Sequence, residues 1–305
     1  MNSLLARLTG CGLLAVGLAA ETAAGERPVI LFELGGKRDA TTVVEPITML
    51  RGGPLEEVPV VFSIGDSAQQ HDRAKRANDA LALTAFPQGA HLWELVAGRA
   101  VGQVKITGHY DEDGVHSGCA WFSIPVTAVG DLGLPSKKPM LAINAATAVD
   151  TGFLQRAPSE RAGRMLDHTA RALFRKSGVA APNRKRMVRA HAAEYYRPAD
   201  GRTMLLADFR IETVEDRRQA MDGLHALFVV LERTRGRWLL AHHAYRFGAD
   251  ADMESEYAID IIDIDGDRRP EIVTRIVQYE SWYFAVHRKR AGRWERAFAG
   301  GGGGC

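Results

Sequence analysis

The stretch Asp263-Ile264-Asp265-Gly266-Asp267-Arg268-Arg269-Pro270-Glu271-Ile272 places three aspartates at alternating positions, with a glycine between the last two. Ca²⁺ takes about six to eight oxygen ligands in proteins. This spacing allows Asp263, Asp265 and Asp267 to turn their carboxylates inward, where the Arg269 carbonyl and Glu271 complete the shell. Residues 272–277 are rich in isoleucine and valine and predict a strand. The stretch therefore predicts a calcium-binding loop that closes onto a strand.

A loop that leads into a strand differs from an EF-hand, whose loop leads into a helix. Residues 263–272 instead resemble the calcium loop of the FG-GAP/VCBS repeats, the blade modules of integrin-like β-propellers. The resemblance is close over this stretch and loose over the rest of the C-terminal region, and it implies Ca²⁺ as the cofactor. Arg268 stands where the family usually has glycine, and Glu271 replaces the usual final aspartate. A metal-free turn held by Asx-type hydrogen bonds is the alternative interpretation.

An internal repeat supports a repeated β unit in the second half of the chain. Gly236-Arg237-Trp238 recurs as Gly292-Arg293-Trp294, and strand-like segments precede both. Asp200-Gly201 falls opposite Asp265-Gly266 when the two copies are aligned. We therefore expect two degenerate FG-GAP/VCBS-like repeats within a C-terminal β region, residues 158–299. Propeller blades of this kind bury their apolar faces against a neighbour.

The fold class predicted for the whole chain is mainly β, with antiparallel, propeller-blade-like strands and one prominent α-helix near 159–177. Short apolar runs between glycine- and proline-rich turns make residues 26–150 an N-terminal β region. The helix is predicted because Ser159 suits an N-cap, apolar residues recur at helical spacing, and Ser177-Gly178 ends the pattern. The two regions are either separate domains or parts of one larger β assembly.

The first 25 residues have the pattern of a secretory signal peptide. Arg7 precedes an uncharged apolar run at 8–20, and small residues follow it. Most of this run follows Cys11, whereas the apolar run of a lipoprotein leader precedes its cysteine, which argues against lipidation. The run is too short to serve as a membrane span. We therefore expect a secreted or periplasmic protein without a membrane span.

Export agrees with the cysteine content. Removal of the leader leaves Cys119 and Cys305, and a pair of cysteines in an oxidising compartment favours a disulfide. Residues 300–305 form a glycine-rich tail, whose five glycines cannot hold a defined conformation unaided. A disulfide would pin this tail, whereas a flexible tether or a Cys305-linked dimer is the alternative.

The charge composition bears on which class of partner the protein binds. The formal net charge is +2, and the absence of a broad basic field argues against a nucleic-acid partner. The preferred function is an exported calcium-binding structural or ligand-binding module without catalysis, whose partner is an extracytoplasmic protein or a glycan.

An exported serine esterase is the alternative function. Gly65-Asp66-Ser67 resembles the nucleophile block of GDSL-type esterases, and Asp222-x-x-His225 resembles their downstream block. The resemblance implies Ser67 as nucleophile, His225 as general base and Asp222 as its orienting carboxylate. The family's Gly-x-Asn-Asp block and its α/β alternation are missing, which argues against this interpretation.

Overall fold

The computed structural model describes residues 28–35, 42–62, 68–113, 121–130, 140–145, 150–214, 222–249 and 252–304. The expected leader, the three cysteines and Ser67 lie outside these residues, so the export and disulfide predictions stay predictions. The described chain is mainly β, and all its strand pairings are antiparallel, as predicted. Three helices accompany the strands.

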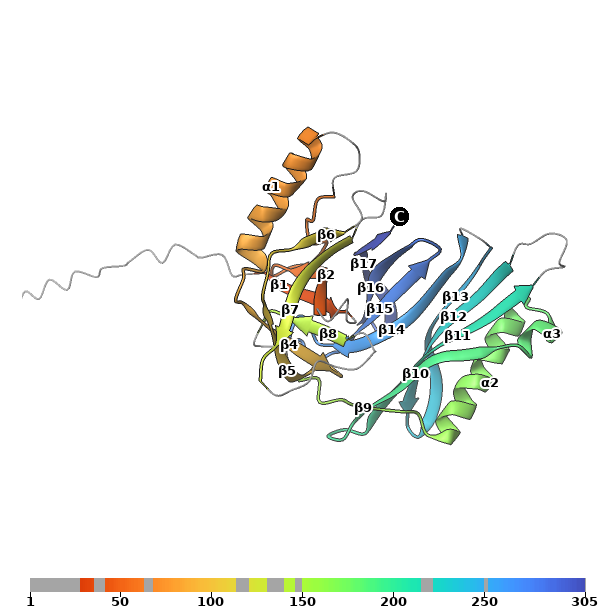
Figure 1. Ribbon diagram of the computed structural model, residues 1–305. Helices are drawn as coiled ribbons and strands as arrows, with labels where there is room; N and C mark the ends of the chain where they lie inside the picture. Colours follow the sequence, from red (N-terminus) through yellow and green to blue (C-terminus); the bar gives the residue numbers. More distant parts are fainter. Residues whose placement is uncertain are drawn as a thin grey trace, which may run out of the picture.

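The N-terminal region forms a closed ring of strands (Figure 1). The sheet order is β3-β2-β1-β8-β4-β5-β7-β6, and an additional β2–β7 pairing closes six of these strands into the ring. The elements are β1 (Val29–Leu34), β2 (Thr42–Leu50), β3 (Leu55–Glu56), α1 (Ala68–Ala85), β4 (His91–Val96), β5 (Arg99–Ile106), β6 (Asp111–Asp113), β7 (Trp121–Ala128) and β8 (Met140–Ile143).

Alternation along these strands gives the ring two apolar surfaces. On β1, Ile30 and Phe32 point into the ring core, where α1 adds Ala82. Leu31 points outward into a second core that the ring shares with the C-terminal strands. Because both faces of the strand are buried, its sequence reads as a continuous apolar run.

The C-terminal region contains two further sheets. The five-stranded sheet has the order β13-β12-β11-β10-β9, and the four-stranded sheet the order β14-β15-β16-β17. The elements are β9 (Leu154–Arg156), α2 (Glu160–Lys176), α3 (Ala181–Arg184), β10 (Val188–Arg197), β11 (Arg202–Val214), β12 (Asp222–Thr234), β13 (Arg237–Ala249), β14 (Glu254–Ile262), β15 (Glu271–Gln278), β16 (Ser281–Arg290) and β17 (Arg293–Gly304).

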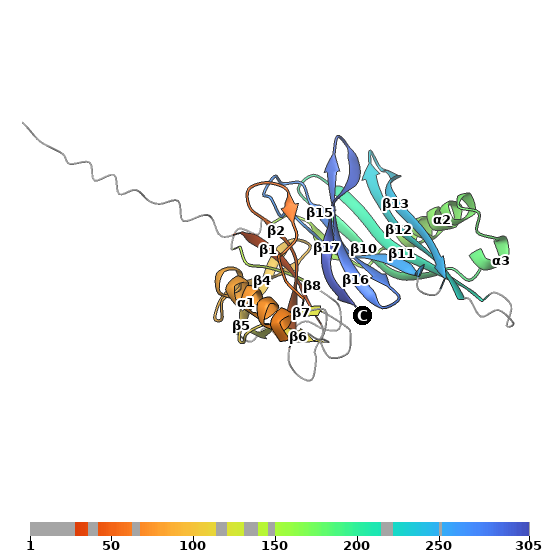
Figure 2. The same cartoon turned by 90° about the horizontal axis from the view of Figure 1, so that it is seen from above.

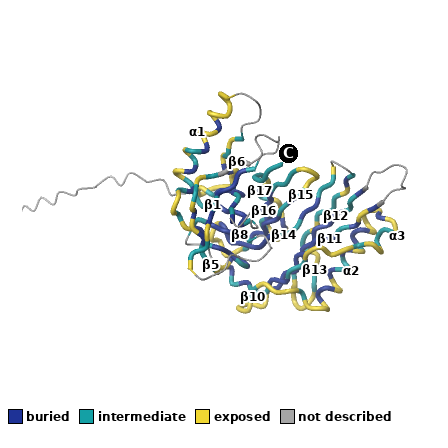
Figure 3. Tube along the Cα trace, in the orientation of Figure 1, coloured by how far each residue is buried: buried dark blue, intermediate teal, exposed yellow. Residues whose placement is uncertain are grey.

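The sheets stack as layers between the ring and α2 (Figures 1 and 2). Leu166 and Phe174 of α2 pack on one face of the five-stranded sheet. The other face, with Phe228, packs on Ile272 of the four-stranded sheet. The far face of the four-stranded sheet, with Val273, packs on the ring. Buried residues accordingly follow the facing strands (Figure 3), and the two regions form one packed β assembly.

Helix α2 is the helix predicted near 159–177. The Ser159 hydroxyl accepts a hydrogen bond from the Ala162 amide at 3.3 Å, which satisfies one free donor of the first turn. Ser177 is its C-cap. Helix α1 buries only Ala74, Asn78 and Ala82, so most of its surface faces solvent.

The glycine-rich tail differs from its prediction. Strand β17 continues through Gly304 and pairs with β16, so Gly300 to Gly304 are not a separate segment. Close backbone approach explains the glycines: a Cβ at Gly302 would lie 2.1 Å from the Trp282 carbonyl oxygen. The Gly301 amide also donates to Glu57 Oε1 at 3.2 Å. Strand pairing and contact with the ring therefore order this tail.

The two copies of the predicted repeat have the same local topology. Strands β10–β13 and β14–β17 are each four-strand meanders, and each Gly-Arg-Trp segment forms the last hairpin turn. Trp238 and Trp294 are both the second residue of their strands. The propeller-blade interpretation goes beyond this topology and remains a prediction.

Candidate functional site

The acidic loop, residues 263–271, joins β14 to β15, as the sequence predicted. Gly266 (φ +76°) and Arg268 (φ +64°) both adopt the left-handed region. Arg268 is thus a non-glycine residue in a conformation that favours glycine. A non-glycine residue in this region costs on the order of 1 kcal/mol.

The three aspartates of the loop come together. One carboxylate oxygen each of Asp263, Asp265 and Asp267 lie within 4.8 Å of one another. Two oxygens bound to one Ca²⁺ lie at most about 5 Å apart, so this spacing fits a shared ion. Asp263 is only 2% exposed, and its Oδ1 is buried without a hydrogen-bond partner. A buried, unpaired carboxylate oxygen is costly unless a ligand satisfies it.

Glu271 is placed differently from its predicted role. Its Oε2 accepts a hydrogen bond from the Ile264 amide at 3.0 Å, and its Oε1 accepts one from Arg288 Nε at 2.9 Å. Arg288 also forms an ion pair with Asp265 at 3.0 Å. Burial raises the pKa of Glu271 to about 7. Both of its oxygens thus have protein donors, and Glu271 anchors the loop to β16.

The loop also contains the hydrogen bonds of the metal-free alternative. Asp265 Oδ1 accepts from the Asp267 amide at 3.2 Å, and Asp267 Oδ1 accepts from the Arg269 amide at 2.7 Å. Asp263 Oδ2 accepts from the Arg268 amide at 2.7 Å. Each of these bonds uses one oxygen of its carboxylate. The second oxygen of Asp265 pairs with Arg288, whereas Asp263 Oδ1 has no hydrogen-bond partner. The residues present therefore fit a calcium ion held by three aspartates, with backbone carbonyl or water oxygens completing its shell.

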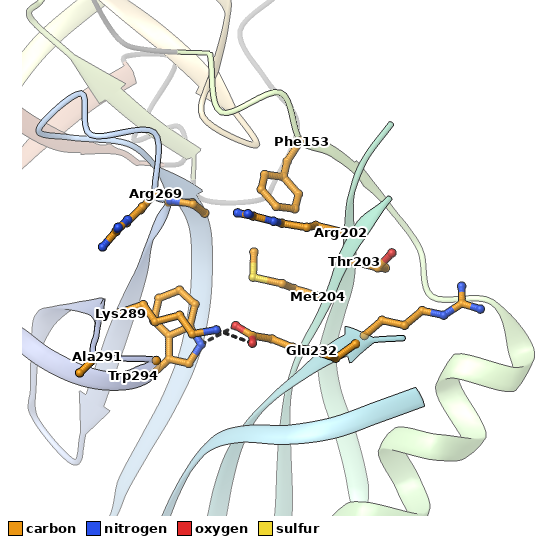
Figure 4. A pocket seen from close by; sticks show the side chains of 13 residues that line it. Phe153, Arg202, Thr203, Met204, Glu232, Arg269, Lys289, Ala291 and Trp294 are labelled. Carbon is orange, nitrogen blue, oxygen red and sulfur yellow. Dashed lines mark hydrogen bonds and ion pairs between the residues drawn. The ribbon is translucent and has the colours of Figure 1, made fainter. Parts of the chain in front are cut away.

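A pocket of about 530 Å³ lies beside the loop, where the turns at one end of the two meanders converge (Figure 4). Two strands, β11 and β12, lie between the β10–β11 turn and the β12–β13 turn. The chain therefore returns to the same end of the sheet, and both turns lie there. The same holds for the acidic loop and the β16–β17 turn. The lining residues are Phe153, Arg202, Thr203, Met204, Glu232, Arg233, Thr234, Arg269, Pro270, Lys289, Ala291, Gly292 and Trp294.

Glu232 links the two sides of this pocket. Its carboxylate accepts hydrogen bonds from Lys289 Nζ at 2.5 Å and from the Trp294 indole N–H at 2.9 Å (Figure 4). Glu232 belongs to the five-stranded sheet, whereas Lys289 and Trp294 belong to the four-stranded sheet. Among the described residues that line the pocket, Glu232 is the only carboxylate, and it is already engaged with two donors.

Two arginines flank the remaining space. Arg202 is 63% exposed and pairs with Asp200 at 3.2 Å. In Figure 4 its guanidinium points across the pocket, above Met204. Arg269 lies on the opposite rim with its guanidinium turned away from Arg202. Arg269 and Pro270 belong to both the acidic loop and the pocket wall, so the two sites are physically continuous.

The sequence predicted the loop but not the pocket. The aligned Asp-Gly and Gly-Arg-Trp turns were the available indication, because equivalent turns of two meanders lie at equivalent ends. That the two ends face each other depends on the packing of the sheets. Neither Glu232 nor Lys289 stands out in the sequence, since a lone charge near a hairpin turn is ordinary.

The esterase alternative gains no geometric support. His225 lies in β12, its Nδ1 is 2.9 Å from the Tyr245 hydroxyl, and its ring stacks on Phe247. Burial lowers its pKa. Ser67 lies outside the described residues, as does the Asp222 side chain, so the triad remains an untested prediction.

Within the described part of the chain, no helix is both long enough and apolar enough to cross a membrane. Comparisons of the chain with protein-family models, with curated proteins and with solved structures found no match. The functional conclusion therefore depends on the geometry of the acidic loop and the pocket beside it.

Proposed function

We propose that this chain is an exported, calcium-stabilised module that binds a ligand in the pocket beside the acidic loop. The observation that carries the proposal is the buried, unpaired Asp263 oxygen next to the carboxylates of Asp265 and Asp267. In this proposal the ion performs no chemistry. Its role is to hold the loop, and with it the pocket wall, in one conformation.

The position of the loop supports a stabilising role. Asp263 lies directly after β14, and Arg269 and Pro270 lie directly before β15. An ion held by the aspartates would therefore fix the backbone of Arg269, whose amide already donates to Asp267. A pocket of this size accommodates a small ligand or a single sugar unit, which favours a glycan over a protein surface as the partner.

The propeller-blade interpretation belongs to the same proposal. Blade-like repeats that have diverged in sequence would keep matching hairpins and matching Asp-Gly turns, which these two meanders have. Asp200 in the first meander pairs with Arg197 and Arg202, whereas its counterpart Asp265 belongs to a cluster of three aspartates. Under this interpretation only the second copy has kept its ion site.

Thermal unfolding in calcium tests the ion site. An ion that binds only the folded state stabilises it by RT ln(1 + [L]/Kd), about 1.4 kcal/mol at ten times Kd. With Arg268 and Arg288 close by, we expect a weak site, with Kd of roughly 10⁻⁴ to 10⁻³ M. The melting temperature should rise with millimolar CaCl₂ relative to EDTA.

A matched pair of variants identifies the loop as the source. Asp265→Ala should abolish the calcium response, whereas Asp200→Ala, in the equivalent turn of the other meander, should keep it. MgCl₂ serves as an ionic-strength control, since Mg²⁺ demands a tighter octahedral shell. Identical melting curves for the unsubstituted protein in calcium and in EDTA would contradict the proposal.

A further inference from the structure

The charge of the pocket restricts the ligand it can hold. Four cationic side chains line it, Arg202, Arg233, Arg269 and Lys289, against the single carboxylate of Glu232. Because Lys289 and the Trp294 indole already satisfy Glu232, that carboxylate does not neutralise the arginines. The lining residues thus carry an excess of three positive charges, and a cleft lined by one sign of charge concentrates their field.

Arg202 is the cation best placed to meet a ligand, and Arg269, on the opposite rim, would reach the ligand after its side chain turns inward. Arg202 projects across the pocket (Figure 4), and Asp200 Oδ2, its ion-pair partner, also accepts a hydrogen bond from Arg197 Nε at 2.9 Å. Arg269 is exposed and makes no ion pair with any described residue. A planar guanidinium presents paired donors that match the two oxygens of a carboxylate.

The floor between these arginines is apolar. Met204, Phe153 and Trp294 belong to the core that joins the two sheets, and each also lines the pocket. A ligand that fits both surfaces has an anionic head group on a compact organic body. Inorganic anions would leave the apolar floor uncovered.

We infer that the pocket binds a small organic anion, such as an acidic sugar, with its charged group on the guanidinium of Arg202, its body against Met204, and the Arg269 side chain turning in from the opposite rim to meet it. This inference rests on the proposed binding function and names the ligand class of the same site. It further couples the ligand to calcium. Asp265 and Asp267 are exposed beside Arg269, and an ion that neutralises them removes their repulsion of an incoming anion.

Calorimetric titration with three related sugars tests the ligand class. D-Glucuronate carries the carboxylate, glucose lacks it, and glucose 6-phosphate carries a different anion on the same ring. We expect glucuronate to bind at least tenfold more tightly than glucose, and its affinity to fall with added salt, since exposed charges are screened. Glucose 6-phosphate shows whether the head-group preference is for a carboxylate or for any anion. Equal binding of glucose and glucuronate, or no anion binding at millimolar concentrations, would overturn the inference.

Arginine variants locate the site. Arg202→Gln combined with Arg269→Gln should weaken glucuronate binding by tenfold or more, because hydrogen bonds to charged groups are lost. Both side chains are exposed, so folding should be unaffected, which the melting temperature checks. Arg171→Gln on the exposed side of α2 is the matched control and should bind like the parent protein. Unchanged affinity in the double variant would overturn the inference.

The same titration separates this inference from the proposed calcium site. We expect glucuronate to bind more tightly in calcium than in EDTA, and Asp265→Ala to remove that difference. Binding in EDTA that depends on Arg202 and Arg269, without any calcium effect on melting, would support the anion pocket and refute the ion site. A calcium-dependent melting temperature without anion binding would support the ion site and refute the anion pocket.

Discussion

The meanders β10–β13 and β14–β17 are built on the same local plan but have different surroundings. Their last hairpins turn through Arg235-Gly236 and Ala291-Gly292, and all four residues have positive φ values. Two consecutive residues with positive φ are typical of a type I′ turn, whose twist suits a two-residue hairpin. The local backbone is therefore the same in both meanders.

The tryptophans that follow these turns face different layers. Trp294 is 7% exposed, lies in the core between the two sheets and donates to Glu232. Trp238 is half-buried and packs with the α2 layer. The comparison teaches that the repeated Gly-Arg-Trp motif fixes the backbone of the turn. The layer that the tryptophan packs against decides how deeply the ring is buried and which contacts it makes.

The buried carboxyl groups of the two meanders also differ in the partners that surround them. In the first meander, Glu194 pairs with Arg156 at 2.7 Å and Asp208 with His191 at 2.9 Å. In the second meander, Asp260 accepts from the Ala97 amide at 2.7 Å and has no cationic partner among the described residues. Burial therefore raises the pKa of Asp260 to about 7. Asp260, in the four-stranded sheet in the middle of the stack, is thus less well compensated by cations than Glu194 and Asp208 are.

The largest expected effect is a difference in stability loss between the alanine variants of the two tryptophans. Trp294→Ala should destabilise the fold by about 4 kcal/mol, because it removes a buried ring and leaves Glu232 with one donor fewer. Trp238→Ala should cost about 1 to 2 kcal/mol, since part of that ring is already in water. Chemical denaturation measures both. Trp294→Phe keeps most of the ring and should lie between them; equal losses for the two alanine variants would break the comparison.

The pH dependence of stability gives the next effect. Burial raises the pKa of Asp260 and of Glu33, which faces Arg275 and Glu45, to about 7 in the folded protein. A raised carboxyl pKa means that the folded state binds the proton more tightly, so stability is lost as pH rises through 7. Between about pH 8 and 6, each group should add about 1.4 kcal/mol on acidification.

Below about pH 6 the gain on acidification should become smaller, because a histidine begins to oppose it. Burial lowers the pKa of His242 to about 4, so protonation of the unfolded chain opposes folding there. Urea denaturation across this pH range measures the profile. Asp260→Asn should reduce the rise between pH 8 and 6. The control is Asp200→Asn in the first meander, which should leave the slope as it is, because the hydrogen bond from Arg197 lowers the pKa of that carboxyl to about 2. An unchanged slope in Asp260→Asn would show that this carboxyl is not protonated near pH 7.

The smallest effect should be the same in both meanders. Gly236 and Gly292 have φ values of +79° and +80°, and nothing lies within 4 Å of a Cβ added at either position. Alanine at each should therefore cost only the left-handed backbone strain, about 1 kcal/mol. Denaturation should give equal losses for the two variants.

Gly98 provides the contrast to these two turns. It also has a positive φ, but a Cβ there would lie 2.5 Å from Thr151 Cγ2 and 3.2 Å from the Ile261 carbonyl oxygen. Gly98→Ala should therefore cost clearly more than Gly236→Ala. A larger loss at Gly292 than at Gly236 would show that tertiary packing reaches into the turn itself.

The sequence by itself determined the features that depend on near neighbours. Helix α2 follows from its N-cap and its apolar periodicity, the hairpins follow from Gly-Arg-Trp, and the gathering of Asp263, Asp265 and Asp267 follows from their alternation. In each case the interacting groups are a few residues apart, so residue type and spacing are enough.

Only the tertiary structure decided the features that join distant segments. The β2–β7 pairing closes the ring, and β16 and the ring order the glycine tail. Arg288 donates to one oxygen of Glu271, a residue that the sequence assigned to an ion. The pocket likewise needs Arg202 and Arg269 from different sheets. The reason is physical: these contacts depend on how two apolar faces stack, and many registers of stacking satisfy the same alternation of apolar residues.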